Sequence, residues 1–137
     1  WPGTIKPKTQ SAVPWAFWDF LPTAAEIAGI DAPGTTDGLS ILPILTGEAN
    51  TLPQREHLYW EFHEGGFKQA VRKDHWKLVR SGTNAKVELF DVSKDIGEQL
   101  DISRNHPDVV KELQQLFTTA RTTSQDFRTP DEMKNKK

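Results

Sequence analysis

Residues 59–79 read YWEFHEGGFKQAVRKDHWKLV, and the alternation of apolar and polar side chains in this stretch decides the fold. Side chains of a β-strand point alternately to opposite faces, so the pattern indicates strands with one buried face and one wet face. Lys73-Asp74 is expected to form a tight hairpin turn. With its flanks, the stretch predicts four strands joined by short links as an antiparallel meander, at residues 57–62, 67–72, 75–81 and 86–92.

A helix is expected after the strands, in the stretch NHPDVVKELQQLFTTART at residues 105–122. Asn105 is the predicted N-cap, and Pro107 suits the first turn, where its missing N–H costs nothing. Apolar residues at helical spacing predict a stripe that packs on the sheet: Val109, Leu113, Leu116, Phe117 and Ala120. A four-stranded antiparallel sheet packed against this C-terminal helix is a two-layer α+β fold.

The first 55 residues predict short helices separated by loops. A helix is expected from Asp19 to Ala28, with Asp19 capping it or lying near the positive end of its dipole. Its predicted buried stripe is Phe20, Leu21, Ala24, Ile27 and Ala28. One further turn is expected over the letters ILPIL, capped by Ser40 and ended by Gly47.

Bulk composition is typical of a folded domain that is neither strongly basic nor strongly acidic. The 137 residues are 36% hydrophobic and 26% charged, with a formal net charge of −2. Nothing in this balance indicates nucleic acid or an acidic membrane surface as a partner. The absence of cysteine excludes disulfides, cysteine-ligated zinc and a thiol nucleophile. Because the chain begins at Trp1 without an initiator methionine, we expect it to be a piece of a longer protein.

The loop HEGGFK at residues 63–68 carries the best candidates for a binding site. His63 and Glu64 precede two glycines, which let a backbone approach a ligand closely. The stretch fails the zinc-peptidase pattern, because Phe67 stands where the second histidine is required. His63 is either a substrate contact or a histidine that only bonds backbone at a strand end.

Two further patterns leave a structural alternative open. Lys68, Arg72 and Lys77 form either a cationic patch for an anion or the solvated face of a sheet. Four of the tryptophans lie inside apolar patterns, so packing is expected for them rather than stacking on sugars: Trp15, Trp18, Trp60 and Trp76. The sequence has no nucleophile elbow, P-loop or dinucleotide-binding glycine motif.

An ordered set of stretches resembles one enzyme family over roughly residues 1–122. The stretches are WPGTIKP, FWDFLPTAAEIAGI, DGLSILPILTGE, YWEFHEGGFKQAVRKDHWKLVR, ELFDVSKDIGEQLDIS and HPDVVKEL. Together they resemble the C-terminal portion of a formylglycine-dependent sulfatase of the arylsulfatase type, in the alkaline-phosphatase-like superfamily. The resemblance implies the truncated end of an α/β catalytic domain and a linker at 1–55, a C-terminal sulfatase subdomain at 56–122, and a polar, frayed tail at 123–137.

The resemblance also implies a reaction whose central groups lie elsewhere. Family members hydrolyse sulfate esters with Ca²⁺ and with a formylglycine made from Cys or Ser in a C/S-x-P-S/A-R motif. Residues 51–55, TLPQR, match only the spacing of that motif, because Thr51 is not convertible. No catalytic residue, metal ligand or cofactor is therefore assigned to this chain, which is expected to be inactive alone. Ca²⁺ and formylglycine are expected in the full-length enzyme.

Expectations about substrate and partners follow from the same resemblance. The full-length substrate is an aryl or carbohydrate sulfate ester, with His63, Glu64 and Lys68 contacting it at the rim of the active-site cleft. The alternatives are a phosphodiesterase or phosphonate hydrolase of the same superfamily, or a non-catalytic glycan-binding or structural module. Self-association through the exposed face of residues 15–30 is expected, with no nucleic acid or membrane partner. By family resemblance alone, the location is periplasmic or secreted.

Two departures from the family pattern bear on folding. Ile96 stands in the stretch DIGE, where relatives often carry proline, so a looser turn is expected at residues 95–98. A glycine is common in the family where this chain has Lys73-Asp74-His75. His75 is therefore a second candidate for the turn position.

Overall fold

A computed structural model describes residues 1–48 and 55–134 of the chain. The chain divides into two compact units, Trp1–Arg55 and Glu56–Lys137, called here the N-terminal unit and the C-terminal unit. Within the described ranges, every helix is too short or too polar to cross a membrane. The stretch TLPQR at residues 51–55, which belongs to the expected linker, lies outside these ranges except for Arg55.

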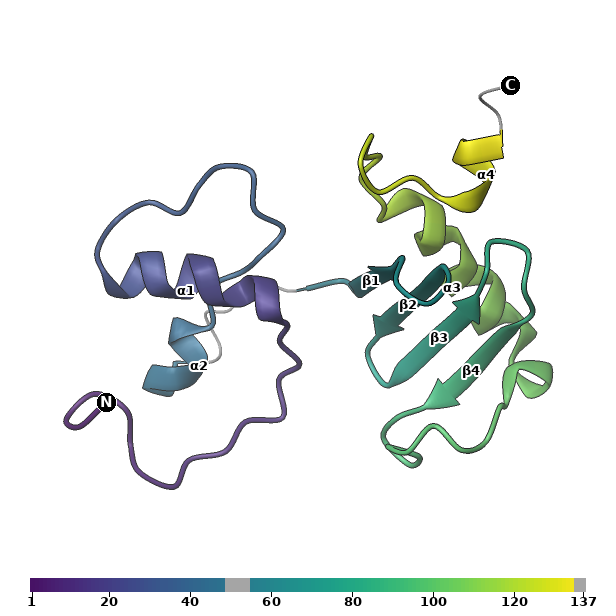
Figure 1. Cartoon of the computed structure of the whole chain (residues 1–137). Helices are drawn as coiled ribbons and strands as arrows, with labels where there is room; N and C mark the ends of the chain where they lie inside the picture. Colours follow the sequence, from purple (N-terminus) through teal and green to yellow (C-terminus); the bar gives the residue numbers. More distant parts are fainter. Residues whose placement is uncertain (49–54, 135–137) are drawn as a thin grey trace. The chain divides into compact units, whose positions relative to one another are not determined.

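The C-terminal unit contains the predicted antiparallel sheet, with its strands in the order β1-β2-β3-β4 (Figure 1). All three pairings are antiparallel between sequence neighbours, so the predicted meander is confirmed. The strands are β1 (Leu58–Phe62), β2 (Lys68–Lys73), β3 (Trp76–Ser81) and β4 (Val87–Asp91).

The hairpin between β2 and β3 turns one residue later than predicted. Lys73 pairs with Trp76, which leaves Asp74 and His75 in the turn. Asp74 has φ +53°, a left-handed conformation that a short polar side chain tolerates better than a bulky one. Arg72 Nε also donates to the Asp74 carbonyl over 3.2 Å. The residue at positive φ is therefore Asp74 rather than His75.

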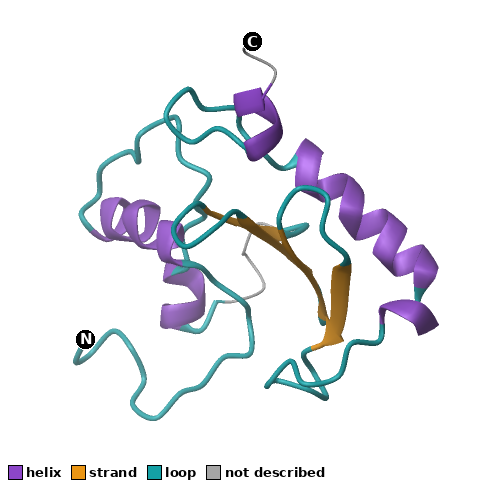
Figure 2. Ribbon diagram, turned by 45° about the vertical axis from the view of Figure 1, so that its right-hand side comes forward, coloured by secondary structure: helices purple, strands orange, loops and turns teal. Residues whose placement is uncertain are grey.

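Helix α3 (Pro107–Thr119) covers one face of the sheet and completes its core (Figure 2). The fully buried cluster consists of Val71, Leu78, Leu89, Leu113 and Phe117, none of them more than 2% exposed. Val109 and Leu116 pack against this cluster, which confirms four positions of the predicted stripe. Burying a side chain of this kind stabilises a fold by about 1.5–3 kcal/mol.

The start of α3 differs from the prediction. Asn105 belongs to the short 3-10 helix η3 (Ser103–Asn105), and His106 occupies the N-cap position without a side-chain cap. A proline disfavours the helical conformation in the residue before it. His106 accordingly has φ −134° and ψ 58°, so the helix cannot begin before Pro107.

Part of the expected frayed tail is folded. Helix α4 (Pro130–Lys134) begins with a reciprocal cap: Thr129 N–H donates to Glu132 Oε2 over 2.7 Å, and Glu132 N–H donates to Thr129 Oγ1 over 3.3 Å. Arg121 Nη1 lies 2.9 Å from Glu132 Oε1. This ion pair ties α4 to the end of α3, which the composition of the tail did not indicate.

The N-terminal unit contains η1 (Phe17–Asp19), α1 (Phe20–Ile27) and α2 (Leu42–Thr46), close to the predicted positions. The turn of α2 ends as predicted, since Gly47 follows it at φ +88°. At its start the N-cap residue is Ile41 rather than the predicted Ser40, although Leu42 N–H donates to Ser40 Oγ over 3.2 Å. Gly38 passes so close to η1 that an added Cβ would lie 2.1 Å from the Trp18 carbonyl oxygen. Only glycine fits at this crossing.

Asp19 organises the N-terminal unit from a fully buried position, at 0% exposure. It stands at the N-cap position of α1, but its carboxylate makes no cap bond there. Instead, Oδ2 accepts Ala16 N–H over 2.7 Å, and Oδ1 accepts Leu39 N–H over 2.9 Å and an ion pair from Arg55. The predicted side-chain cap of α1 is therefore not formed, whereas the alternative, a position near the positive end of the helix dipole, agrees with the structure.

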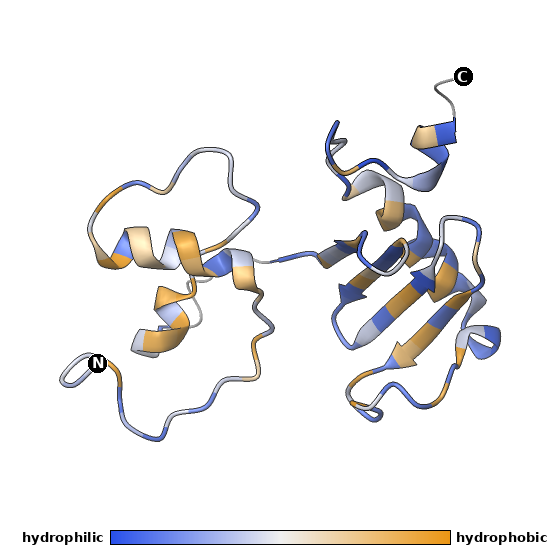
Figure 3. Cartoon of the chain, in the orientation of Figure 1, coloured by the Kyte–Doolittle hydropathy of each residue, from blue (hydrophilic) through white to orange (hydrophobic). Residues whose placement is uncertain are grey.

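The predicted stripe of α1 is not buried within the described residues, which agrees with the exposed face expected for residues 15–30. The buried residues of the helix are Pro22, Thr23 and Ala25, whereas Phe20 is 66% exposed and Ile27 is 45% exposed. Thr23 fixes this orientation, because its hydroxyl donates to the Asp19 carbonyl over 2.6 Å and accepts Ile41 N–H over 2.9 Å. Apolar residues lie along the whole helix, as the colouring of Figure 3 shows, and the large ones are exposed.

Candidate functional site

The loop between β1 and β2 has the open backbone that the sequence predicts. Gly65 has φ +66° and Gly66 has φ +108°, which are backbone conformations that residues other than glycine rarely adopt. An added Cβ at either position would meet nothing within 4 Å. Glu64 is exposed beside them. A ligand could therefore approach this backbone closely.

His63 at the start of the loop is held by side chains. Its Nε2 lies 2.8 Å from Glu61 Oε1, and its ring lies 5.3 Å from the Phe67 ring and 5.6 Å from the Phe127 ring. The side chain keeps 26% exposure. The partner of His63 is thus a carboxylate, not the backbone that the structural alternative proposed, and part of the imidazole still faces solvent.

Glu61 is the centre of a polar network that orients His63. Its Oε2 accepts the Tyr59 hydroxyl over 2.5 Å and Arg121 Nε over 2.8 Å. Burial by itself would raise the pKa of Glu61, but the hydrogen bonds from Tyr59, Arg121 and His63 outweigh it and lower that pKa. Burial and the bond to Glu61 raise the pKa of Tyr59. Tyr59 therefore remains a protonated donor and Glu61 an ionised acceptor.

The network continues across the sheet beneath α3. Gln69 Nε2 donates to the Tyr59 hydroxyl over 2.6 Å and to the Phe117 carbonyl over 3.2 Å, and Gln69 Oε1 accepts Arg80 Nε over 2.7 Å. The Arg80 guanidinium lies 4.5 Å from the centre of the Phe117 ring. The sequence pattern alone did not indicate these residues. The signal was a glutamine in the inward-facing register of Val71, where a polar side chain needs buried partners.

Lys68 lies on the other face of the sheet from this network. Successive residues of a strand point to opposite faces, so Gln69 faces α3 and Lys68 faces away from it. Lys68 is exposed and pairs across the sheet with Phe62 and Ser81. Because His63 is bonded to Glu61, which pairs with Gln69, the structure does not bring His63 and Lys68 together on one face.

The three predicted cations do share a face. Arg72 and Lys77 are cross-strand partners, and Lys68 stands four residues before Arg72 on the same strand. Lys77 Nζ is paired with Glu98 over 2.5 Å, and Arg72 donates to the turn carbonyl of Asp74. In the ranges 1–48 and 55–134, Lys68 has no ion pair within 4.0 Å, so it is the member best able to meet an external anion.

The part of the chain that the structure describes contains no candidate metal site. No group of three or more His, Asp or Glu side chains there could hold a metal ion. The described side chains therefore do not fit the Ca²⁺ that the family resemblance implies, and no step through that ion is derived from them.

Comparisons with known proteins agree on one family. The family model described as "N-sulphoglucosamine sulphohydrolase, C-terminal" matches residues 1–123. The chain is 28% identical to arylsulfatase K of Danio rerio over 82% of this chain and 23% of the relative. It is 25% identical to N-acetylgalactosamine-6-O-sulfatase of Bacteroides thetaiotaomicron, over 89% of this chain and 26% of that relative.

A solved structure supports the same relationship. A putative sulfatase from Bacteroides thetaiotaomicron superposes with a TM-score of 0.65 at 26% identity, covering 72% of this chain and 23% of that one. The α+β sheet and helix described above are therefore shared with sulfatases. The chain spans about a quarter of the length of the curated relatives it matches.

Proposed function

The chain belongs to the N-sulphoglucosamine sulphohydrolase C-terminal family of sulfatases, and from this membership we propose that it is the C-terminal part of an enzyme that hydrolyses sulfate esters of aryl or carbohydrate substrates. The observation that carries the proposal is the family match over residues 1–123, which spans both units. A relative named for N-acetylgalactosamine-6-O-sulfate hydrolysis favours the carbohydrate class.

The reacting groups belong to an upstream part in this proposal. When bound there, Ca²⁺ and formylglycine would supply sulfate polarisation and the nucleophile. The residues of this chain contribute shape and substrate contacts instead. The exposed aromatic residues of the N-terminal unit would be covered by that upstream part, since relatives are about four times longer than this chain.

The HEGGFK loop is the proposed substrate contact. Its two glycines at positive φ open the backbone, and the Glu61 carboxylate fixes the His63 ring from one side. The remaining imidazole surface would bond a substrate hydroxyl or the leaving-group side. Lys68 and Glu64 are exposed at the two ends of the loop, where Lys68 would meet a second anionic group and Glu64 a hydroxyl.

An activity assay tests the proposal. The parent protein with its upstream part should hydrolyse an aryl sulfate or a sulfated monosaccharide, and the 137-residue chain alone should give only the rate of a protein-free blank. Turnover of a phosphodiester without turnover of any sulfate ester would replace the proposal by the superfamily alternative. Turnover by the 137-residue chain itself would contradict the proposal that the reacting groups lie in the upstream part.

Substitutions in the parent protein test the loop separately. His63→Ala and Lys68→Ala should each lower kcat/KM by about tenfold or more, roughly 1.4 kcal/mol, with thermal stability nearly unchanged. Lys111→Ala is the matched control, because Lys111 is exposed on α3 and away from the loop. His63→Gln would retain a donor toward Glu61, so loss of activity in both His63 variants identifies substrate contact rather than lost scaffolding. Unchanged kinetics in all variants would reduce the loop to a structural role.

A further inference from the structure

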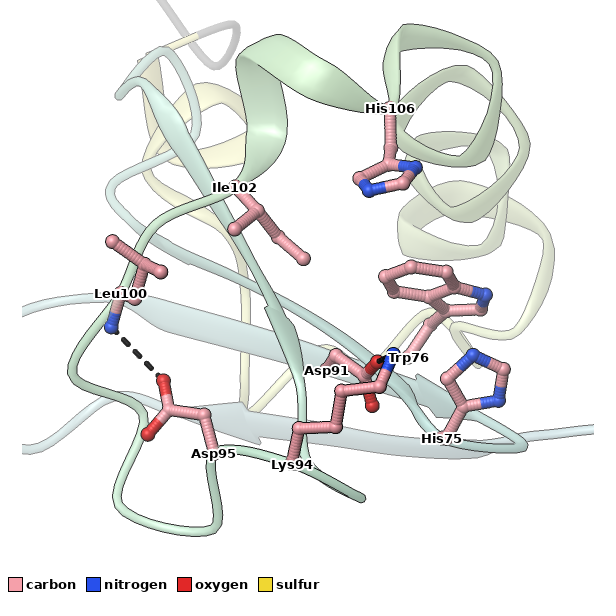
Figure 4. Close-up of a pocket in the computed structure, with 8 residues that line it drawn as sticks. All are labelled: His75, Trp76, Asp91, Lys94, Asp95, Leu100, Ile102 and His106. Atoms are coloured by element: carbon pink, nitrogen blue, oxygen red, sulfur yellow. Dashed lines mark hydrogen bonds and ion pairs between the residues drawn. The ribbon is translucent and has the colours of Figure 1, made fainter.

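A pocket of about 320 Å³ lies in the C-terminal unit, apart from the HEGGFK loop (Figure 4). Its lining comes from the turn before β3, the end of β4 with the chain after it, and the start of α3. The lining residues are His75, Trp76, Asp91, Lys94, Asp95, Leu100, Ile102 and His106. Pockets of roughly 300 Å³ and above are the usual size for small molecules, and this one has room for a single ring.

A fixed aromatic ring forms one wall of the pocket. The Trp76 indole lies 4.5 Å from the His75 ring and 4.9 Å from the His106 ring, and it packs against the core cluster below. Figure 4 shows Leu100 and Ile102 across the pocket from Trp76. A rigid indole offers a large apolar contact at little cost in conformational entropy. The two walls therefore suit a flat, partly apolar ligand.

Charged groups line the pocket beside these walls. Asp91 accepts the Ser93 hydroxyl over 2.5 Å and Lys94 Nζ over 2.9 Å, and these bonds lower the pKa of Asp91 to about 2. Asp95 Oδ2 accepts the N–H groups of Gln99 and Leu100 over 2.8 and 2.9 Å. These bonds connect the two ends of the turn at residues 95–98.

The charge balance of the lining is unequal. Two carboxylates, Asp91 and Asp95, stand against one ammonium, Lys94, whose side chain is 83% exposed. Within residues 1–48 and 55–134, Asp95 Oδ1 accepts no hydrogen bond and is left as an acceptor for a ligand. The histidine and aspartate side chains of the pocket do not form a metal-binding group in those residues.

We propose that this pocket binds one sugar ring through its free hydroxyls and disfavours a sulfate group on that ring. A pyranose has an apolar C–H face, which fits the edge of the Trp76 indole between the two histidine rings and the aliphatic side chains opposite (Figure 4). Its hydroxyls would donate to the free Asp95 oxygen and accept from Lys94. Because Lys94 is already paired with Asp91, a sulfate would meet the Asp95 carboxylate, which has no ion pair among the described residues, and like charges at short range repel.

The inference goes beyond the proposed function, because it requires no hydrolysis and concerns this chain alone. A failed binding test would leave the sulfatase assay unaffected, and a failed assay would leave the pocket unaffected. The ligand class rests on the pocket's own walls and charges.

The test is an NMR titration of the 137-residue chain, observed at the Trp76 indole N–H, with the resonance assigned from Trp76→Phe. The probes are galactose, N-acetylglucosamine and N-acetylglucosamine 6-sulfate. At least one neutral sugar should give a saturable shift with a Kd on the order of 1 mM, and the 6-sulfate should bind about tenfold more weakly than N-acetylglucosamine. No saturable shift up to about 100 mM, or tighter binding of the sulfated sugar, would overturn the proposal.

Two exposed apolar residues of the same connection provide a matched pair of variants. Leu100 lines the pocket at 66% exposure, whereas Ile96 does not line it and is 83% exposed. Leu100→Ala should weaken sugar binding by about threefold to tenfold, and Ile96→Ala should not change it. Neither variant removes a buried side chain, so folding is retained. Equal effects of the two substitutions, or no effect of Leu100→Ala, would assign the indole shift to another surface.

Discussion

The two units of the chain are organised around opposite kinds of centre. The C-terminal unit has five apolar side chains at its centre, each at most 2% exposed. The N-terminal unit has a carboxylate at its centre, Asp19 at 0% exposure, while Phe17 is 88% exposed and Phe20 is 66% exposed. Hydrogen bonds can give a segment a definite conformation. Only the C-terminal unit also has a large apolar core, whose burial stabilises a fold.

The C-terminal unit therefore has its stabilising apolar contacts within the described part of the chain, whereas the N-terminal unit leaves its large apolar side chains exposed. Exposed apolar surface of this extent on one helix is typical of an interface. Under the proposed function, the N-terminal unit ends a larger catalytic domain whose upstream part covers that surface. The C-terminal unit needs no such cover for its core, because α3 already seals the sheet.

Removing the carboxylate of the N-terminal unit should have the largest effect. Asp19→Ala leaves Arg55 and the N–H groups of Ala16 and Leu39 without their acceptor, and breaking a buried pair costs about 3–5 kcal/mol. In the parent protein, amide exchange measured residue by residue should lose protection throughout residues 16–46, with no change at Leu78 or Leu89. Asp37→Ala, at an exposed position of the same unit, is the control. Retained protection in Asp19→Ala would show that the carboxylate does not organise the unit.

A cavity in the apolar core should have the next largest effect, confined to the other unit. Leu78 is 0% exposed, so Leu78→Ala should destabilise the C-terminal unit by about 2–5 kcal/mol. Denaturant unfolding followed at the indole N–H resonance of Trp76 measures the change. Val79→Ala, one residue on and facing away from α3, should cost about 1 kcal/mol. Similar losses in both variants would mean that the two faces of the sheet contribute alike.

The exposed aromatic face should drive self-association of the chain. Phe17→Ser together with Phe20→Ser should weaken association by about tenfold or more, roughly 1.4 kcal/mol, in light scattering across a concentration series. Ile96→Ser in the C-terminal unit, equally exposed, should leave it unchanged. A wild-type chain that stays monomeric at all concentrations would exclude this face as a contact surface.

Acid should weaken the C-terminal unit by a smaller amount. Hydrogen bonds from Ser93 and Lys94 lower the pKa of Asp91 to about 2, and Lys86 holds the pKa of Asp101 well below its usual range. A carboxyl whose pKa is lowered by folding stabilises the fold above its unfolded pKa of about 4 and loses that contribution as the pH falls. Tm should therefore fall between about pH 4 and pH 2, and less steeply in Asp101→Asn. If Tm falls equally steeply with pH in the wild type and in Asp101→Asn, Asp101 does not contribute to the pH dependence of stability.

The local sequence pattern predicted the strands and the apolar core, but it did not predict the contacts of the buried Asp19 carboxylate. Alternation located the four strands, and helical spacing located Leu113 and Phe117 in the core. The partners of Asp19, however, lie 20 and 36 residues away, at Leu39 and Arg55. Local reasoning assigned the nearest role, a cap of α1, and did not find these two contacts.

The candidate site shows the same limit. The glycines of the HEGGFK loop were identified from their type, and their positive φ angles agree with that interpretation. The anchor of the site was missed, because Glu61 meets Arg121 across 60 residues of sequence. Substrate contact by His63, Glu64 and Lys68 stays a prediction, since the structure establishes only their exposure and their protein partners.

Hydrogen exchange compared between two lengths of the protein tests the central claim most directly. The claim is that the C-terminal unit is stabilised by its own core, whereas the N-terminal unit depends on an upstream part. In the 137-residue chain, amides of β2, β3 and α3 should be strongly protected and those of η1 and α1 weakly protected. In the parent protein, protection of η1 and α1 should rise by about two orders of magnitude or more, with β2, β3 and α3 nearly unchanged. Equal protection of η1 and α1 in the two proteins would contradict the account.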